Sequence, residues 1–479
     1  MAEQRETPLL KETENYYYEN CPGCKVDRRK AQDPNPPYIH FSFIFAVALA
    51  AALPVSSIFP FLYNMVRDFH IAKREEDVSF YAGFEGSSYM VGRTLTAVLW
   101  GVIADRYGRK PVMLISTLGI VIFNTLFGFS TNYWMAMATR FCIGALCGIL
   151  GPIRAYCTEV CRREHQALGL AMVTSAWGIG LVIGPALGGY LAEPAIYYPT
   201  VFSPDSIFGR FPYLLVSLVI SAIGLVVTGL CFWLPETLHN HSDHAKIQDE
   251  PHDIEDVAIS TLDDDQKKES AGGTAPSWLA ILKNWPYMST LIGFCVFQLH
   301  DMAYTEIFSL WTVTPRSLGG VGLTSADVGQ ALAVSGVGLL LCQVLIYPTL
   351  EKYFGPIIIA RVGAVLSIAL LSSYPFIAKL SGVVLTVLID LASTLKNVLA
   401  VSIQTGYFLL QNRAVTQRQR GSASGLSLCL MSFCKAISPA IAGYILSWSE
   451  TRLTAHFLPG PQIVFFIMNI VLAIGFLTT

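Results

Sequence analysis

Charged side chains are scarce in this sequence. Of its 479 residues only 14% are Asp, Glu, Lys or Arg, whereas 53% are hydrophobic. A soluble domain carries about 25% charged residues, so this chain has too little charge to cover a water-facing surface. The net charge of −2 and the lack of a basic stripe give no indication of a nucleic-acid partner. The composition indicates a protein whose main partner is the lipid bilayer.

Other sequence features that would point to different protein classes are also missing. The first apolar run begins near Phe41 and is too long for the hydrophobic region of a secretory signal. No GxxxxGK[ST] loop is present, so ATP-driven chemistry is not supported. No loop combines a nucleophile with a base or a catalytic metal constellation. We therefore expect neither an enzyme nor a cofactor.

Long hydrophobic runs dominate what is present. Runs of about 20 apolar residues are long enough to cross a membrane as helices, and they lack the alternation of a membrane barrel. Twelve runs qualify, the last of them short: 41–63, 80–103, 112–130, 133–153, 167–191, 213–234, 288–311, 326–350, 357–378, 383–408, 424–446 and 463–477. Because the last run is short, we expect the end at Thr479 to be clipped or alternative.

The twelve runs fall into two groups of six. The predicted organisation is a tail over 1–40, a six-helix half over 41–234, a linker over 235–285 and a second half over 286–479. Lys and Arg concentrate in the tail, the linker and the loops on their side of the membrane. This pattern predicts that the N-terminus is cytosolic. We expect the chain to act as a monomer.

The two halves carry matching short stretches. The loop 105-DRYG-108 pairs with 351-EKYFG-355, and 184-GPALGGY-190 pairs with 438-SPAIAGY-444, at offsets of about 250 residues. Transporters built from two such repeats bind their substrate near the bilayer midplane, between the halves. The pattern predicts an all-α secondary transporter.

The loop 100-WGVIADRYGRKP-111 is the most specific motif. Its glycine permits a tight turn between helices, and its basic residues hold the loop in the cytosol. The stretch resembles the cytoplasmic loop motif of the major facilitator superfamily, whose fold has twelve transmembrane helices in two six-helix halves. The matching residues are Gly101, Asp105, Arg106, Gly108, Arg109 and Lys110.

The fifth span, 175-SAWGIGLVIGPALGGYL-191, has small residues at four-residue spacing. They form a flat face that lets another helix approach closely, and a proline permits a bend. The span resembles the antiporter motif of the same superfamily, with Ser175, Gly180, Gly184, Pro185, Gly188 and Gly189 as the matching residues. Tight packing and a direct part in coupling both stay open; we expect the stripe to build the pathway without carrying the proton.

Ionisable residues inside spans are the candidates for transport, because each is costly in a membrane unless paired or hydrated. In this superfamily spans 1, 4, 7 and 10 line the central cavity, so the resemblance places six of the candidates near the route: Arg140, Arg154, His300, Asp301, Asp390 and Lys396. Glu306 of span 7 is a further candidate at bilayer depth, although it points away from Asp301 around the helix. A carboxylate beside a histidine can carry a proton near neutral pH, which predicts this role for Asp301. Alternatively, Asp301 neutralises Lys396 or an arginine.

Two segments outside the spans carry metal-binding residue types. Cys21 and Cys24 stand in the tail, and four histidines stand in the linker: His239, His241, His244 and His252. Because zinc takes four ligands, a regulatory Cys2His2 site across the two segments is one interpretation, and an inert tail with a disordered acidic linker is the other. We do not expect redox chemistry, because a proline-containing tail should not place a thiol at a helix N-terminus.

Together, 21-CPGC-24, 100-WGVIADRYGRK-110, 175-SAWGIGLVIGPALGG-189 and 235-PETLH-239 resemble the plant zinc-induced facilitator-like family over the whole chain. The resemblance implies a proton-coupled antiporter that moves a small solute out of the cytosol, into the vacuole rather than across the plasma membrane. The implied substrate is a metal chelator such as nicotianamine or a phytosiderophore, or its zinc or iron complex. Two rivals are a potassium, monovalent-cation or organic-anion exchanger and a metal-sensing membrane receptor.

Overall fold

A computed structural model describes residues 21–33, 35–162, 165–238, 282–342, 346–415 and 420–477. Within these ranges the chain forms helices and no strand. The four linker histidines lie outside the described residues, so the predicted zinc ligands of the linker are not part of the structure described below.

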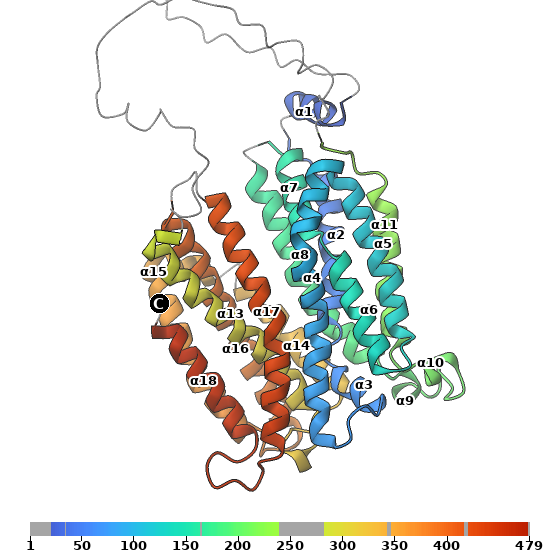
Figure 1. Ribbon diagram of the computed structural model, residues 1–479, viewed down its shortest axis with the longest axis vertical. Helices are drawn as coiled ribbons and strands as arrows, with labels where there is room; N and C mark the ends of the chain where they lie inside the picture. The colour runs from blue at the N-terminus through green and yellow to red at the C-terminus, as the bar shows by residue number, and fades with distance from the viewer. Residues whose placement is uncertain are drawn as a thin grey trace, which may run out of the picture.

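The helices form two bundles side by side, with α1 lying across one end (Figure 1). We call this end of the molecule the α1 end and the opposite end the α9 end. The N-terminal half contains α2 (Tyr38–Ser56), α4 (Val78–Tyr107), α5 (Arg109–Gly128), α6 (Tyr133–Leu146), α7 (Leu150–Val160), α8 (Gln166–Leu191) and α11 (Leu214–Cys231). The C-terminal half contains α13 (Trp285–Val313), α14 (Ser325–Leu341), α15 (Tyr347–Ile377), α16 (Gly382–Arg413), α17 (Arg420–Glu450) and α18 (Pro461–Leu477).

Short helices connect these elements: α1 (Pro22–Gln32), α3 (Leu62–Asp68), η1 (Glu75–Asp77), α9 (Pro194–Tyr197), α10 (Ile207–Arg210) and η3 (Arg316–Leu318). Eleven of the twelve predicted spans each coincide with one helix, and the span over 133–153 coincides with α6 and α7 in succession, so the predicted architecture of twelve transmembrane spans in two halves is confirmed. The last of them, α18, has 17 residues, which agrees with the prediction of a short final span.

Length and hydropathy alone select fewer helices. Among the described residues, eight helical stretches are long and apolar enough to cross a membrane, and α14 and α18 are shorter apolar helices. The remaining two spans, α4 and α13, are 30 and 29 residues long. Both carry charged residues near their middle, which lowers their hydropathy. These charges belong to the candidate site.

Two predicted boundaries differ from the structure. The span over 133–153 is two helices, because the chain leaves helical geometry at Cys147. The Trp100 ring occupies the space beside Gly148, and Trp100 donates a hydrogen bond to the Ala145 carbonyl at 2.6 Å. The span over 326–350 ends at Leu341, and α15 already begins at Tyr347, ahead of the predicted loop.

The prediction that the tail places no thiol at a helix N-terminus is wrong. Residues Pro22–Gln32 form α1, and Cys21 is its N-cap, so the first thiol does lie at a helix N-terminus. Pro22 explains the start, since proline at the first helical position has a suitable φ and no N–H to satisfy. Cys21 and Cys24 are only 2% and 3% exposed. The pair therefore belongs to a docked helix.

The internal repeat is visible in the backbone. Gly108 has φ 108° and ψ 161°, and Gly355 has φ 74° and ψ 164°. This region is open essentially only to glycine. Each glycine interrupts two helices that follow one another, at matching positions of the two halves. The short matches in sequence therefore correspond to the same turn.

The halves meet at two helix crossings with the same construction. At the α4–α17 crossing, a methyl group on Gly83 would lie 2.9 Å from the Cα of Gly443. At the α8–α14 crossing, a methyl group on Gly329 would lie 2.8 Å from the Cα of Gly189. Small residues let the helix backbones approach closely. Figure 1 shows α4 and α17 running side by side along the junction.

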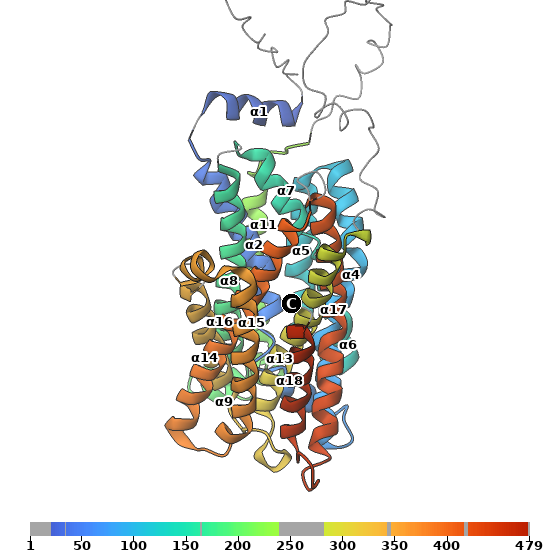
Figure 2. The same cartoon turned by 90° about the vertical axis from the view of Figure 1, so that its left-hand side faces the viewer.

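Polar contacts close the junction toward the α9 end. Ser79 donates to a Glu450 carboxylate oxygen at 3.0 Å, and Asn64 donates to the Ser325 hydroxyl at 3.0 Å. Both bonds join the N-terminal half to the C-terminal half. Figure 2, turned by 90°, shows the same long axis with α1 set apart at one end.

Candidate functional site

Ionisable side chains gather in the middle of the bundle at two depths. We call Glu85, Arg140 and Glu306 the acidic cluster; each lies seven residues from the α9-end terminus of its helix. We call Arg93, Arg154 and Lys435 the cationic cluster, which lies nearer the α1 end. Seven helical residues span about 10 Å, and Arg93 and Lys435 each lie 15 residues from the α9-end terminus of their helices (93 − 78 and 450 − 435), so both clusters lie at membrane depth.

The acidic cluster joins the two halves. Glu85 and Glu306 are 1% and 0% exposed, and neither carboxylate has a hydrogen-bond partner among the described residues. A methyl group on Gly86 would lie 2.8 Å from a Glu306 oxygen, so the side chain of α13 packs directly against α4. The charge of Arg140 acts on both carboxylates.

Arg140 is held by groups that do not neutralise it. Its Nη1 donates to the Pro54 carbonyl at 2.6 Å, and its guanidinium lies 5.3 Å from the Tyr89 ring and 5.6 Å from the Phe127 ring. Its Nε has no partner among the described residues. The side chain is fixed in place, and its charge remains for the carboxylates on either side.

Lys396 and Asp301 lie in the C-terminal half beside the cationic cluster. The Lys396 Nζ is buried without a hydrogen-bond partner in the described chain and lies 4.4 Å from the Tyr304 ring centroid. The Asp301 charge acts on both Lys396 and Lys435. His300 is fully buried and stacks on Phe297 at 6.3 Å. The predicted set of Asp301, His300 and Lys396 is thus gathered in space.

Two other predicted residues lie apart from this group. Asp390 interacts with Gln330 and Asp327 of α14 instead of Lys396. Arg154 is exposed on α7, and the nearby charge that acts on it is that of Arg93. Sequence reasoning did not select Glu85, Arg93 and Lys435, because the choice followed spans 1, 4, 7 and 10. These three residues lie on α4 and α17, the helices that cross each other between the halves. The sequence feature that could have identified them is a charged residue within an apolar span.

A network of polar contacts covers the α1 end of the N-terminal half; we call it the α1 latch. The Glu236 carboxylate accepts hydrogen bonds from the backbone N–H groups of Arg109 and Lys110, both at 3.0 Å. Because these N–H groups open α5, Glu236 acts as an anionic cap at its positive end. The space beside Gly108 is filled by the same carboxylate. The loop motif and 235-PETLH-239 therefore fit each other directly.

Glu159 links this cap to its surroundings. Arg109 pairs with Glu159 at 3.1 Å and with Asp105, while the Thr237 hydroxyl donates to Glu159 at 2.5 Å. Two other motif residues have no contact with this network among those described. A methyl group added to Gly101 would meet nothing within 4 Å, and Arg106 is exposed above the Tyr107 ring.

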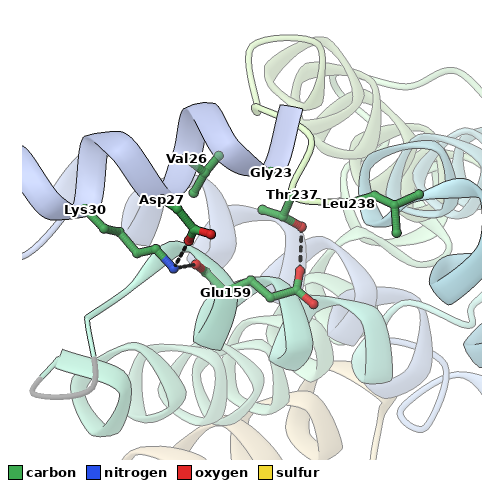
Figure 3. Close-up of a pocket in the computed structure, with 7 residues that line it drawn as sticks. All are labelled: Gly23, Val26, Asp27, Lys30, Glu159, Thr237 and Leu238. Atoms are coloured by element: carbon green, nitrogen blue, oxygen red, sulfur yellow. Dashed lines mark hydrogen bonds and ion pairs between the residues drawn. The ribbon is translucent and has the colours of Figure 1, made fainter. Parts of the chain in front are cut away.

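Helix α1 docks onto this network. The Gly23 N–H donates to the Leu238 carbonyl at 3.2 Å, and Lys30 donates to the Glu159 carbonyl at 2.6 Å while pairing with Asp27. A cavity of about 260 Å³ lies between them (Figure 3), lined by Gly23, Val26, Asp27, Lys30, Glu159, Thr237 and Leu238. The CPGC segment and PETLH are thus contact partners.

The small residues of α8 mainly face helix α2. The space beside Gly180 is filled by Ala52, and the spaces beside Gly184 and Gly188 are filled by Ser56 and Ser57. Gly189 faces α14 instead, across the junction between the halves. Ser175 is exposed, and Pro185 lies within the helix. The stripe therefore holds α8 to α2 on one side and reaches the other half with its last glycine.

The cysteines do not form a metal site among the described residues. In these ranges no group of three or more His, Cys, Asp or Glu could hold a metal ion. Cys157 and Cys161, one helical turn apart on α7, interact with each other. Their hydrogen bond, together with burial, raises the pKa of Cys161. The two thiols are therefore partners of each other, with no third ligand beside them among the described residues.

The sequence matches the Major Facilitator Superfamily over residues 44–426. It is 52% identical to the zinc-induced facilitator-like 1 protein of Arabidopsis thaliana, with 100% of this chain and 98% of that protein covered. The chain belongs to the zinc-induced facilitator-like family of the major facilitator superfamily. Zinc-induced facilitator 1 of the same plant is 49% identical, with 99% of this chain and 97% of that protein covered.

The fold agrees with this family. A bacterial homologue of the lysosomal transporter spinster, solved in an inward-facing conformation, superposes with a TM-score of 0.65 over 93% of this chain and 97% of that chain, at 13% identity. This zinc-induced facilitator-like protein is therefore an integral multi-pass membrane transporter, and it is not an enzyme. The predicted family, fold and lack of enzymatic function are confirmed.

Proposed function

We propose that this transporter is a proton-coupled antiporter that exports a small metal chelator from the cytosol. The substrate is an amino-carboxylate such as nicotianamine or a phytosiderophore, free or as its zinc or iron complex. The zinc-induced names of the relatives support a role in metal homeostasis. The basic residues of the tail and linker support a cytosolic α1 end. The vacuolar membrane is the proposed location, and the chain acts as a monomer.

The observation that carries the proposal is the acidic cluster. Glu85 and Glu306 are buried at membrane depth without hydrogen-bond partners, on helices of opposite halves. Intramembrane carboxylates of this kind bind and release protons in transporters. Arg140 lies between them and can stabilise whichever carboxylate is ionised. Because α4 and α13 belong to different halves, proton binding here changes the electrostatics of the junction on which rocking depends.

The roles of the C-terminal residues follow from their positions. Glu306 carries the proton in this proposal, since its carboxylate has no partner among the described residues and faces Arg140. Asp301 acts on two lysines and so provides the counter-charge for Lys396 and Lys435. His300 is buried near Lys396, and its two ring nitrogens have no hydrogen-bond partner among the described residues, so in this proposal it is a second group that can exchange a proton. In this proposal Asp390 lines the route at about the depth of the acidic cluster, and Arg154 lines it beside Arg93.

Flux measurements in proteoliposomes test this function. The purified chain is reconstituted, and uptake of labelled nicotianamine, zinc and potassium is followed with and without an imposed pH gradient. We expect nicotianamine uptake to rise when the vesicle interior is more acidic than the medium, because protons then leave the vesicle as the substrate enters. Potassium flux alone would favour the cation exchanger, flux of simple carboxylates alone would favour the organic-anion exchanger, and no flux of any solute would favour the receptor.

A further inference from the structure

Arg93 has two other cationic side chains in its electrostatic surroundings, one in its own half and one across the junction between the halves. Arg93 of α4 acts electrostatically on both Arg154 of α7 and Lys435 of α17. The two long helices are tied together at this depth, since Thr94 donates to the Ser432 carbonyl at 3.3 Å. This bond lies one residue from Arg93 and three from Lys435. The cationic cluster is therefore shared by both halves.

The cluster has too little negative charge around it. In the part of the chain that the structure describes, none of the three side chains lies within 4.0 Å of a carboxylate. Asp301 acts on Lys435 but also on Lys396, whose Nζ is fully buried and has no hydrogen-bond partner in the described chain. One carboxylate thus stands against four cations. Arg154 is exposed and Arg93 and Lys435 are partly exposed, so an anion can reach the cluster, and its binding would lower the repulsion between the cations.

The side chains have the chemistry of a carboxylate site. Guanidinium groups bind carboxylates with two parallel hydrogen bonds, and ammonium groups bind them as point charges. The Arg93 guanidinium lies 5.8 Å from the Trp177 ring centroid, which limits its orientations. Stacking on a ring occupies the face of a guanidinium and leaves its N–H edge for a ligand.

We infer that Arg93, Arg154 and Lys435 form the site that binds the carboxylates of the substrate, and that the substrate carries at least two of them. Lys396 provides a further contact on the far side of Asp301. A substrate amine pairs with Asp301 itself. The inference rests on the proposed export of an amino-carboxylate and adds its contact residues and charge. A site with an excess of three positive charges repels a monovalent cation, which separates it from potassium exchange.

Binding to the purified full-length chain tests this site without transport. Titration calorimetry in nanodiscs compares citrate, succinate and acetate at low ionic strength. We expect affinity to fall in that order and to fall with added salt, because exposed charges are screened. Gln substitution at Arg93 or Lys435 should weaken citrate binding about tenfold or more, the scale of one lost charge-assisted contact. Lys435→Arg should retain most of it.

Lys379→Gln is the matched control, because Lys379 is an exposed cation remote from the site. Its citrate affinity should equal that of the unmodified chain. Thermal unfolding shows that each variant is folded, and removal of one repelling cation should not lower the midpoint without ligand. If one Gln variant fails to fold, the other and Arg154→Gln decide the question.

The outcomes separate the site from the function. Acetate binding as tightly as citrate, or unchanged citrate affinity in the folded Gln variants, overturns the inference, even if nicotianamine flux proceeds. Carboxylate binding that depends on Arg93 and Lys435 supports the inference, even if no proton-coupled flux is found and the proposed function fails.

Discussion

The α1 latch and the acidic cluster treat their charges in opposite ways. In the latch, Glu236 accepts two hydrogen bonds from the start of α5, and Glu159 accepts from Arg109 and Thr237. In the acidic cluster, both carboxylates are more deeply buried and have no partner among the described residues. The carboxylates of the α1 latch are therefore hydrogen-bonded although water could also reach them. The carboxylates of the acidic cluster have no such partner although little water reaches them.

This difference separates a region that stabilises one arrangement of the chain from a region that can bind a proton or a counter-ion. A network whose members are all satisfied stabilises one arrangement of the chain. A buried charge without partners is costly, and its cost falls when a proton or a counter-ion arrives. The latch thus suits a fixed cytosolic end, whereas the two membrane clusters suit groups that change partners during transport. Substitutions in each region should distinguish these roles.

Arg140→Gln should have the largest effect. Arg140 is 2% exposed and is the cation that acts on both Glu85 and Glu306. Removing the positive partner of a buried ionic group costs about 3–5 kcal/mol, so we expect a lower unfolding midpoint and loss of proton-driven flux. Thermal unfolding in detergent and proteoliposome uptake measure the two effects. Arg210→Gln, at an exposed arginine in the α10 segment, is the control; a similar loss there would contradict a specific role for Arg140.

Glu306→Gln should uncouple transport with less damage to the fold. The amide keeps the shape of the side chain but cannot exchange a proton, so flux driven by a pH gradient should be lost. Exchange of labelled for unlabelled substrate, which needs no net proton movement, should persist. Asp301→Asn should instead weaken binding of an amino-carboxylate, because the amide removes the negative charge that pairs with the substrate amine. If Asp301→Asn loses pH-driven flux and Glu306→Gln keeps it, then Asp301 and not Glu306 is the residue that carries the proton.

The sequence predicts the fold well because apolar runs of membrane length leave few alternatives. It also finds α4 and α13 in spite of their charges, since the flanking residues remain apolar. Its main error in the fold is α1, whose signals were present: Pro22 at the first helical position and Arg29 with Lys30 in the last turn. The prolines at 34, 36 and 37 do not prevent this helix, because they lie beyond its last residue, Gln32.

The candidate site is predicted only in part. Arg140, Glu306, Lys396 and Asp301 stand out as charges inside spans, and the structure gathers them into clusters. Glu85 and Arg93 were passed over because the choice of helices came from a family pattern and not from packing. Which helices cross between the halves depends on small residues brought together from distant segments, such as Gly83 and Gly443. A single sequence does not show such pairs.

Gly108→Ala and Gly355→Ala compare the latch with its counterpart in the other half. Both glycines have backbone angles that cost another residue about 1–3 kcal/mol. At Gly108 the added methyl group would also meet the Glu236 carboxylate, whereas nothing lies within 4 Å of the same position at Gly355. We expect Gly108→Ala to lower the unfolding midpoint more than Gly355→Ala. Equal shifts of the two midpoints would show that Glu236 moves aside freely and that the α1 latch contributes little to stability.

Replacing Cys21 and Cys24 together by Ser should have the smallest effect on stability. Both thiols are buried in docked α1, but serine is close in size and the helix keeps its contacts through Gly23 and Lys30. Zinc titration of the full chain then tests the predicted regulatory site. We expect zinc binding to weaken in the double variant, because a thiolate is a stronger zinc ligand than a hydroxyl. Unchanged zinc affinity would leave the cysteines as packing residues of α1, and the latch would then act through its charges alone.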